Sequence, residues 1–147
     1  MPRARAAALA LALCLGCSEF RPVETDFVGS GIHGCTDDRF VDRSADDAMR
    51  VVAFGGTMGS GSTAYDPPCL TVAAGQTVTF AGNFTFHPLR PGESRGLALG
   101  SANNPIPPTS SGDATVEVSF PSVGTYPYFC QVHAAIGMRG VVRVVAR

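Results

Sequence analysis

Four residues of this chain form a set that can bind a redox-active metal. Cys130, His133 and Met138 lie close together near the C-terminus, and His87 ends an aromatic, β-prone run further upstream. A thiolate and a thioether favour Cu(I), whereas imidazole suits either oxidation state of copper. A trigonal arrangement of one Cys and two His with a long axial Met matches the ideal geometry of neither state, so little has to move when an electron arrives. The residue types therefore predict a copper site for one-electron transfer.

The spacing of the C-terminal residues suits a single binding point. Cys130 and His133 bracket a short segment that can turn tightly and direct both side chains to one place. Taken alone, this pair could equally be half of a zinc site. Zinc could also occupy all four ligands, because the order of metal affinities alone does not decide which metal a cell loads.

β-prone runs flank these residues and would hold them in place. An aromatic run ends at Cys130, and a valine-rich run, residues 140–146, begins just after Met138. His87 ends a third run, residues 84–87. The fourth ligand would therefore come from a different part of a β-structure, which is expected of a rigid site.

In this combination and order, the chain resembles the cupredoxins, specifically the plastocyanin and azurin type of blue copper protein. The resemblance covers residues 49–147, about the size of one small domain. It implies one type 1 copper ion, with the sulfur of Cys130 and the imidazoles of His87 and His133 in the trigonal plane. Met138 would be the weak axial ligand that tunes the reduction potential.

The resemblance also implies a role and a docking site. Cupredoxins of this type are electron carriers, not enzymes, and redox protein partners meet them at an apolar patch beside the exposed His. We carry this patch over to His133 and its neighbour Ile136. The chain is expected to act as a monomer outside the cytoplasm.

One residue departs from the family pattern. Pro88 follows His87, where the resembling proteins carry Asn, whose backbone N–H helps to hold the copper-bound sulfur. Proline has no backbone N–H. We therefore expect the sulfur of Cys130 to rely on other donors, such as the N–H of Val132. Fewer hydrogen bonds to a thiolate favour Cu(II), so we also expect a lower reduction potential.

Two other functions compete with the electron carrier. A copper enzyme is disfavoured, because it would need a second catalytic centre and the chain has three histidines. A copper-delivery or storage module would use accessible, exchangeable ligands, whereas these residues predict a closed site with four ligands. The rate at which copper leaves the protein would distinguish delivery from electron transfer.

The N-terminus has the pattern of an export signal. A short basic start precedes the apolar run 6–15, which is too short to span a bilayer as a helix. Gly16 and Cys17 resemble the lipobox of bacterial lipoproteins, although Cys14 stands where that motif usually has Leu. We expect an exported protein of the periplasm or cell envelope, anchored in the membrane by a lipid on Cys17. The alternative is a soluble exported protein cut nearby.

Two further cysteines, Cys35 and Cys69, remain. In an exported protein they most simply form a disulfide, and the alternative is two unpaired thiols. The whole chain is nearly neutral, with 11 basic and 12 acidic residues. Nothing in this balance indicates nucleic-acid binding.

The chain divides into three parts by its pattern. Residues 1–16 are predicted to be the signal peptide, residues 17–48 the lipid attachment site and a tether, and residues 49–147 the cupredoxin domain. Within the tether, residues 36–47 could pack through the Cys35 bridge or remain solvated. His33 is interpreted as an incidental surface residue, because nothing with metal-ligand spacing surrounds it.

Short runs rich in Val, Thr and aromatic residues fill the third part, separated by Gly, Pro and Asn. With no convincing long helix, they predict an all-β fold, an antiparallel Greek-key β-sandwich. Residues 88–112 are expected to be mostly loop, with 96–99 extended. The predicted strands are residues 50–54, 70–73, 76–81, 84–87, 115–120, 125–130 and 140–146.

Overall fold

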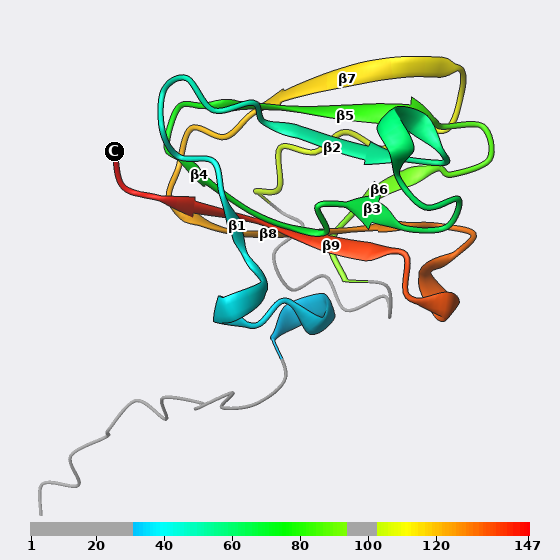
Figure 1. Ribbon diagram of the computed structural model, residues 1–147, viewed down its shortest axis with the longest axis horizontal. Coiled ribbons are helices and arrows are strands. Elements are labelled where there is room, and N and C mark those ends of the chain that lie inside the picture. Colours follow the sequence, from blue (N-terminus) through cyan, green and yellow to red (C-terminus); the bar gives the residue numbers. More distant parts are fainter. Residues whose placement is uncertain (1–30, 94–102) are drawn as a thin grey trace, which may run out of the picture.

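The computed structural model describes residues 31–93 and 103–147, and in it two β-sheets face each other (Figure 1). The first sheet contains, in spatial order, β1 (Val41–Asp42), β4 (Cys69–Ala73), β9 (Arg139–Val145), β8 (Gly124–Cys130) and β6 (Leu89–Pro91). The second contains β3 (Tyr65–Asp66), β2 (Val51–Phe54), β5 (Thr77–Asn83) and β7 (Asp113–Ser119). Helical structure in the described residues is limited to the 3-10 turns η1 (Ile32–Gly34), η2 (Asp37–Arg39), η3 (Thr57–Gly59) and η4 (Ala134–Ile136). The predicted all-β sandwich is confirmed.

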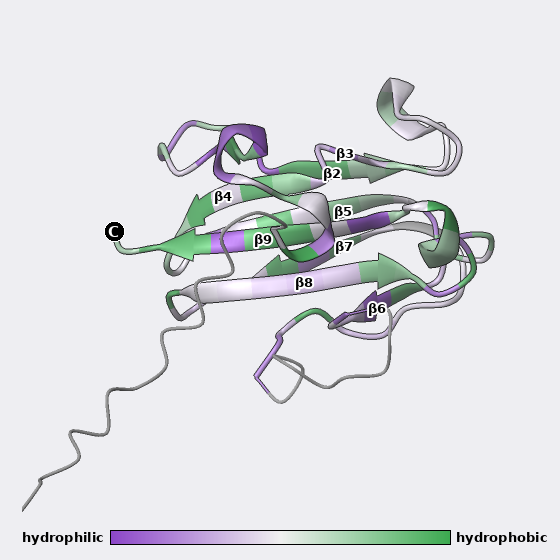
Figure 2. Cartoon of the chain, turned by 90° about the horizontal axis from the view of Figure 1, so that it is seen from below, coloured by the Kyte–Doolittle hydropathy of each residue, from purple (hydrophilic) through white to green (hydrophobic). Residues whose placement is uncertain are grey.

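The core lies between the sheets and follows the period of two that strands impose on their side chains. Val78 and Phe80 of β5 are fully buried, and Val118 of β7 faces the same core. Tyr128 and Cys130 of β8 alternate with the partly exposed Phe129 between them. In Figure 2, strands such as β4 and β9 are mainly hydrophobic. Burial of these side chains is the main force that holds the two sheets together.

Strand pairing is mixed, so the predicted antiparallel pairing holds for some neighbouring strands and not for others. β5 and β7, β6 and β8, β8 and β9, and β2 and β3 pair antiparallel. β1 and β4, β4 and β9, and β2 and β5 pair parallel, because the chain crosses between the sheets instead of returning beside its last strand. β8 and β9 form a long hairpin, and its connection, residues 131–138, contains two predicted ligands, His133 and Met138, and directly follows a third, Cys130.

Residues 84–87 form a turn, so the predicted strand there is wrong. The side chain of Asn83 accepts hydrogen bonds from the backbone N–H groups of Thr85 and Phe86 at 3.0 and 3.1 Å. The N–H of His87 donates to the carbonyl of Asn83 at 3.0 Å. An Asn side chain that binds backbone N–H groups further along the chain favours a turn over a strand. The following strand, β6, was missed, because a proline stands before it and another at its end.

The described part of the predicted tether packs against the first sheet. Cys35 and Cys69 form a disulfide, which confirms that pairing. Arg143 of β9 donates to the carboxylate of Asp37 at 2.6 Å, and its guanidinium lies 3.9 Å from the ring centre of Phe40. Together with the pairing of β1 and β4, these contacts show that residues 36–47 adopt the packed arrangement of the two considered.

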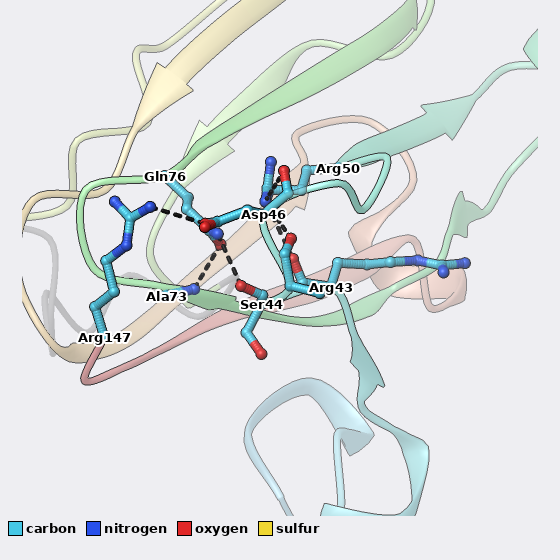
Figure 3. Close-up of polar contacts among 8 residues, drawn as sticks. Arg43, Ser44, Asp46, Arg50, Ala73, Gln76 and Arg147 are labelled. Carbon is cyan, nitrogen blue, oxygen red and sulfur yellow. Dashed lines mark hydrogen bonds and ion pairs between the residues drawn. The ribbon is translucent and has the colours of Figure 1, made fainter.

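A polar network fixes the rest of this segment at the edge of the sandwich (Figure 3). The buried side chain of Gln76 donates to the carbonyl of Ser44 and accepts from the N–H of Ala73, both at 2.8 Å. The guanidinium of Arg50 donates to the carbonyl of Arg43 at 3.0 Å. These bonds satisfy the carbonyls of Arg43 and Ser44, which lie between β1 and β2, and the N–H of Ala73 at the end of β4.

His33 is half-buried, so its interpretation as an incidental surface residue is wrong. Its Nδ1 lies 3.0 Å from the carbonyl oxygen of Gly140 on β9, and its buried Nε2 has no hydrogen-bond partner among the described residues. Burial lowers the pKa of His33. The predicted signal peptide, residues 1–16, Cys17 and the predicted extended segment 96–99 lie outside the described residues. Within the described ranges, no helix has the length and apolar character needed to cross a membrane.

Candidate metal centre

Three of the four predicted ligands converge at one end of the sandwich. The Cys130 Sγ lies 3.4 Å from the Nδ1 of His133 and 4.0 Å from the Nδ1 of His87. The two Nδ1 atoms are 3.1 Å apart. All three donor atoms lie within 4.8 Å of one another, so the three side chains could hold one metal ion.

The hairpin between β8 and β9 positions two of these side chains. Cys130 is the last residue of β8, and its backbone N–H donates to the carbonyl of Met138 at 3.0 Å. The N–H of Met138 donates to the carbonyl of His133 at 3.2 Å. The loop is therefore closed at its base and braced across its middle. The tight turn predicted between Cys130 and His133 is present.

The third side chain, that of His87, is brought in from the connection between β5 and β6. Leu89, two residues later, is the register partner of Cys130 in the pairing of β6 with β8. The carbonyl of Pro88 accepts a hydrogen bond from the N–H of Gln131 at 2.9 Å. The His87 turn and the Cys130 loop are thus joined directly by backbone contacts, although they are far apart in the sequence.

Met138 lies in the same loop and is fully buried. It belongs to the same buried core cluster as Cys130. Its backbone contacts both Cys130 and His133, as described above. These observations place Met138 beside the cluster, and ligation by its sulfur stays a prediction.

Burial differs among the three converging side chains. Cys130 is a free, fully buried thiol, His87 is 7% exposed, and His133 is more open to solvent. Burial lowers the pKa of His87, and the nearby His133 lowers it further. A lowered pKa favours the neutral imidazole, which is the form that binds metals. The lowered pKa of His87 therefore favours a ring nitrogen that is free to bind a metal cation.

The donor set fits copper chemically. One thiol and two imidazole nitrogens are soft or borderline donors, and no carboxylate belongs to the cluster in the described residues. Such a set suits copper or zinc better than Mg²⁺ or Ca²⁺, which prefer oxygen ligands. The fully buried thioether of Met138 beside the cluster is the additional feature of an electron-transfer copper site.

Sequence reasoning missed the residues that surround the ring of His87. The ring of Phe54 lies edge-on to it, and the backbone of Gly55 stands against its outer edge. Asn83 holds its backbone N–H. The only local signal was the Gly-Gly pair at 55–56, which indicates a turn but not what lies behind it.

Comparison with known proteins gives a consistent assignment. The model of a family described as copper binding proteins, plastocyanin/azurin family, matches residues 52–145. Plastocyanin A/B of Petroselinum crispum is 34% identical over 88 residues, which cover 57% of this chain and 90% of that protein. Plastocyanin of Scenedesmus fuscus is 33% identical over 92 residues, 58% of this chain and 90% of that protein.

A solved structure supports the fold. A Cu-containing nitrite reductase from Thermus scotoductus superposes with a TM-score of 0.53 at 19% identity, covering 76% of this chain. The matched region is 29% of the reductase, so this likeness concerns the sandwich alone. The family match, in contrast, covers strands of both sheets and every residue of the converging cluster. The chain therefore belongs to the plastocyanin/azurin family of copper-binding, electron-transfer proteins, and its cofactor is copper.

Proposed function

We propose that the protein carries single electrons between redox partners outside the cytoplasm, through one type 1 copper ion. His87, Cys130 and His133 would form the trigonal plane, and Met138 would be the weak axial ligand. The observation that carries this proposal is the convergence of a buried thiol and two imidazole Nδ1 atoms within 4.8 Å. Bound copper would supply the one-electron couple.

The chain's own contribution is a frame that holds the donor atoms before any metal binds. Cys130 is held by its pairing with Leu89 on one side and by its bond to the carbonyl of Met138 on the other. The turn at Asn83 fixes the backbone of His87. Donor atoms that are already in place need little rearrangement when an electron arrives or leaves, which favours fast transfer.

The end of the molecule that contains the cluster also presents exposed apolar side chains. η3 and η4 lie at this end, opposite the C-terminus (Figure 1). We define the docking surface by four exposed residues: Met58, Phe86, Val132 and Ile136. Phe86 directly precedes His87, and Val132 directly precedes His133. The ring centroids of the two histidines are 4.8 Å apart. His133 is the more exposed of the two rings, so its edge is the proposed route for the electron.

The loops that carry this surface contain no charged side chains. Residues 55–64, 83–88 and 131–138 include no Asp, Glu, Lys or Arg. These loops therefore supply no charged side chain of their own, and the guanidinium of Arg139, which donates to the carbonyl of Ala134 at 2.8 Å, lies at the border of the third loop. We propose partners that present an equally apolar, uncharged face around their own redox centre.

Export and lipid attachment belong to the same proposal. The apolar run 6–15 supports export, and the disulfide between Cys35 and Cys69 suits an oxidising compartment. Acylation at Cys17 would hold the domain near a membrane. Loss of membrane partitioning in a Cys17→Ser variant is the expected result, and unchanged partitioning would rule the anchor out.

The first experiment is to add Cu(II) to the purified metal-free protein and record its visible spectrum. An intense charge-transfer band that disappears on reduction, and that is absent in Cys130→Ser, is expected. A colourless protein that binds copper weakly and releases it quickly to a chelator would instead support the delivery or storage alternative.

A further inference from the structure

The outer edge of the His87 ring is enclosed by a residue that is not among the four proposed ligands. Gly55 directly follows β2, in the sheet opposite the one that carries Cys130. A Cβ added to Gly55 would lie 3.0 Å from the Cδ2 and 3.3 Å from the Nε2 of His87. At such separations the neighbouring group must give way by a few tenths of an ångström. A Cβ on residue 55 would therefore crowd the ring in its present position.

The wall behind this contact is rigid. Phe54 precedes Gly55, is fully buried, and lies edge-on to the His87 ring at a centroid distance of 6.1 Å. The rings of Phe84 and Tyr65 brace Phe54 at 5.1 and 5.3 Å. A close-packed interior of this kind transmits a displacement instead of absorbing it.

Hydrogen bonds hold the backbone around His87 in place. Its N–H is bound to the carbonyl of Asn83 at 3.0 Å, and its neighbour Pro88 is bound to Gln131. A side chain at position 55 would therefore push the imidazole of His87 and rotate it about the side-chain bonds of His87. Because Nδ1 and Cδ2 are attached to the same ring carbon, a push on Cδ2 also moves Nδ1.

Gly55 also keeps space open beside the other ring nitrogen. The Nδ1 atoms of His87 and His133 face each other and the sulfur of Cys130. With Nδ1 committed to a metal, Nε2 carries the ring proton and needs room for a hydrogen-bond partner. A side chain on Gly55 would take that room.

We propose that Gly55, backed by Phe54, is a positioning residue that sets the plane of the His87 imidazole and so aims its Nδ1 at the copper ion. This inference rests on the proposed function, specifically on His87 as a ligand. The contact joins β2 of one sheet to the ligand cluster of the other.

Backbone conformation provides a matched control. Gly55 and Gly56 both have positive φ, 65° and 81°, so an alanine at either position is strained. An added Cβ at Gly56 meets nothing within 4 Å, whereas one at Gly55 meets His87. A comparison of Gly55→Ala with Gly56→Ala therefore separates contact with the ring from backbone strain. Gly55→Asn adds a further separation, because Asn tolerates the left-handed conformation but still carries a Cβ.

The test measures Cu(II) dissociation constants, charge-transfer spectra and reduction potentials of wild type and these three variants. We expect Gly55→Ala and Gly55→Asn to weaken Cu(II) binding by about tenfold and to shift the charge-transfer band and the potential. Gly56→Ala should keep the wild-type spectrum and potential. Crystal structures of the metal-free proteins should show the His87 ring turned only in the Gly55 variants.

Two results would overturn the inference while leaving the proposed function intact. One is a wild-type spectrum and potential in both Gly55 variants. The other is an equal change in Gly56→Ala, which would assign the effect to loop strain. A wild-type protein without a copper-thiolate band would instead reject the proposed function itself, and this inference with it.

Discussion

The backbone N–H of Cys130 donates to the carbonyl of Met138 at 3.0 Å. This bond joins the first and last residues of the loop 130–138, which contains three of the four predicted ligands. The loop between them therefore forms a closed unit within the β8 and β9 hairpin. Backbone hydrogen bonds within the loop fix the positions from which its side chains extend. A substitution within this loop can consequently alter the metal's properties while leaving the sandwich intact.

Met138→Leu tests the axial role of the thioether. Leu fills a similar buried volume, so the free energy of unfolding should fall by less than about 1.5 kcal/mol. Removal of the weak sulfur donor should disfavour Cu(II), and the reduction potential should rise while the charge-transfer band remains. Redox titration of the copper-loaded protein measures this. Met58→Leu, at an exposed methionine, is the control and should leave the potential unchanged; an unchanged potential in Met138→Leu would remove Met138 from the ligand set.

Ile136→Glu tests the docking surface. The side chain is 68% exposed, so the fold and the visible spectrum should not change. Burying an unpaired carboxylate in an apolar contact costs at least about 1.4 kcal/mol, which corresponds to a tenfold slower exchange. The electron self-exchange rate of the copper-loaded protein, measured by NMR, is the appropriate quantity because it needs no known partner.

Val123→Glu is the matched control for this substitution. Val123 is 63% exposed and lies in the turn before β8, at the end of the sandwich that includes the C-terminal end of β9. Its variant should exchange electrons at the wild-type rate. The wild-type rate should also depend only weakly on ionic strength, because the docking loops contain no charged residue and a single guanidinium, that of Arg139, contacts the loop 131–138 among the contacts of the described residues. Equal slowing in both variants would argue against a localised docking surface.

The convergence of Cys130 and His133 could be predicted because they lie three positions apart around a turn, and the longer strands could be predicted because their side chains alternate. The predicted strand at residues 84–87 failed because the side chain of Asn83 binds two backbone N–H groups, which outweighs the β-propensity of Phe84 and Phe86. The contact of Gly55 with His87 could not be predicted. It arises where β2 and the β5–β6 connection meet, and no spacing along the chain indicates that meeting.

Removal of the disulfide tests whether the N-terminal segment supports the domain or the metal site. Cys35 and Cys69 are 34 positions apart, and their bond restricts the unfolded chain. Replacing both by Ser should lower the free energy of unfolding by about 3 kcal/mol. The charge-transfer band should persist, because the disulfide is not part of the ligand cluster. Urea unfolding and visible spectra measure the two effects, and loss of the band in a folded variant would contradict this separation.

His33 predicts a pH dependence of stability. Burial holds the pKa of His33 below its ordinary value of 6.5, with Arg139 acting in the same direction and Glu93 and the bond to Gly140 opposing it. The unfolded chain therefore takes up the proton first as the pH falls. The stabilising contribution is fully present above 6.5 and is lost as the pH falls below that value toward the pKa of the folded state.

His33→Asn isolates this contribution, because Asn tolerates the positive φ of 56° at this position and does not titrate. Urea unfolding of the metal-free protein at pH 5.5, 6.5 and 7.5 should give a shallower increase of stability with pH in the variant than in wild type. His87 adds a slope of the same sign in both proteins, since burial also lowers its pKa. Only the difference between the two slopes is therefore assigned to His33. Identical slopes would mean that the imidazole of His33 is protonated as easily in the folded protein as in the unfolded chain, and that its contact with Gly140 does not depend on its charge.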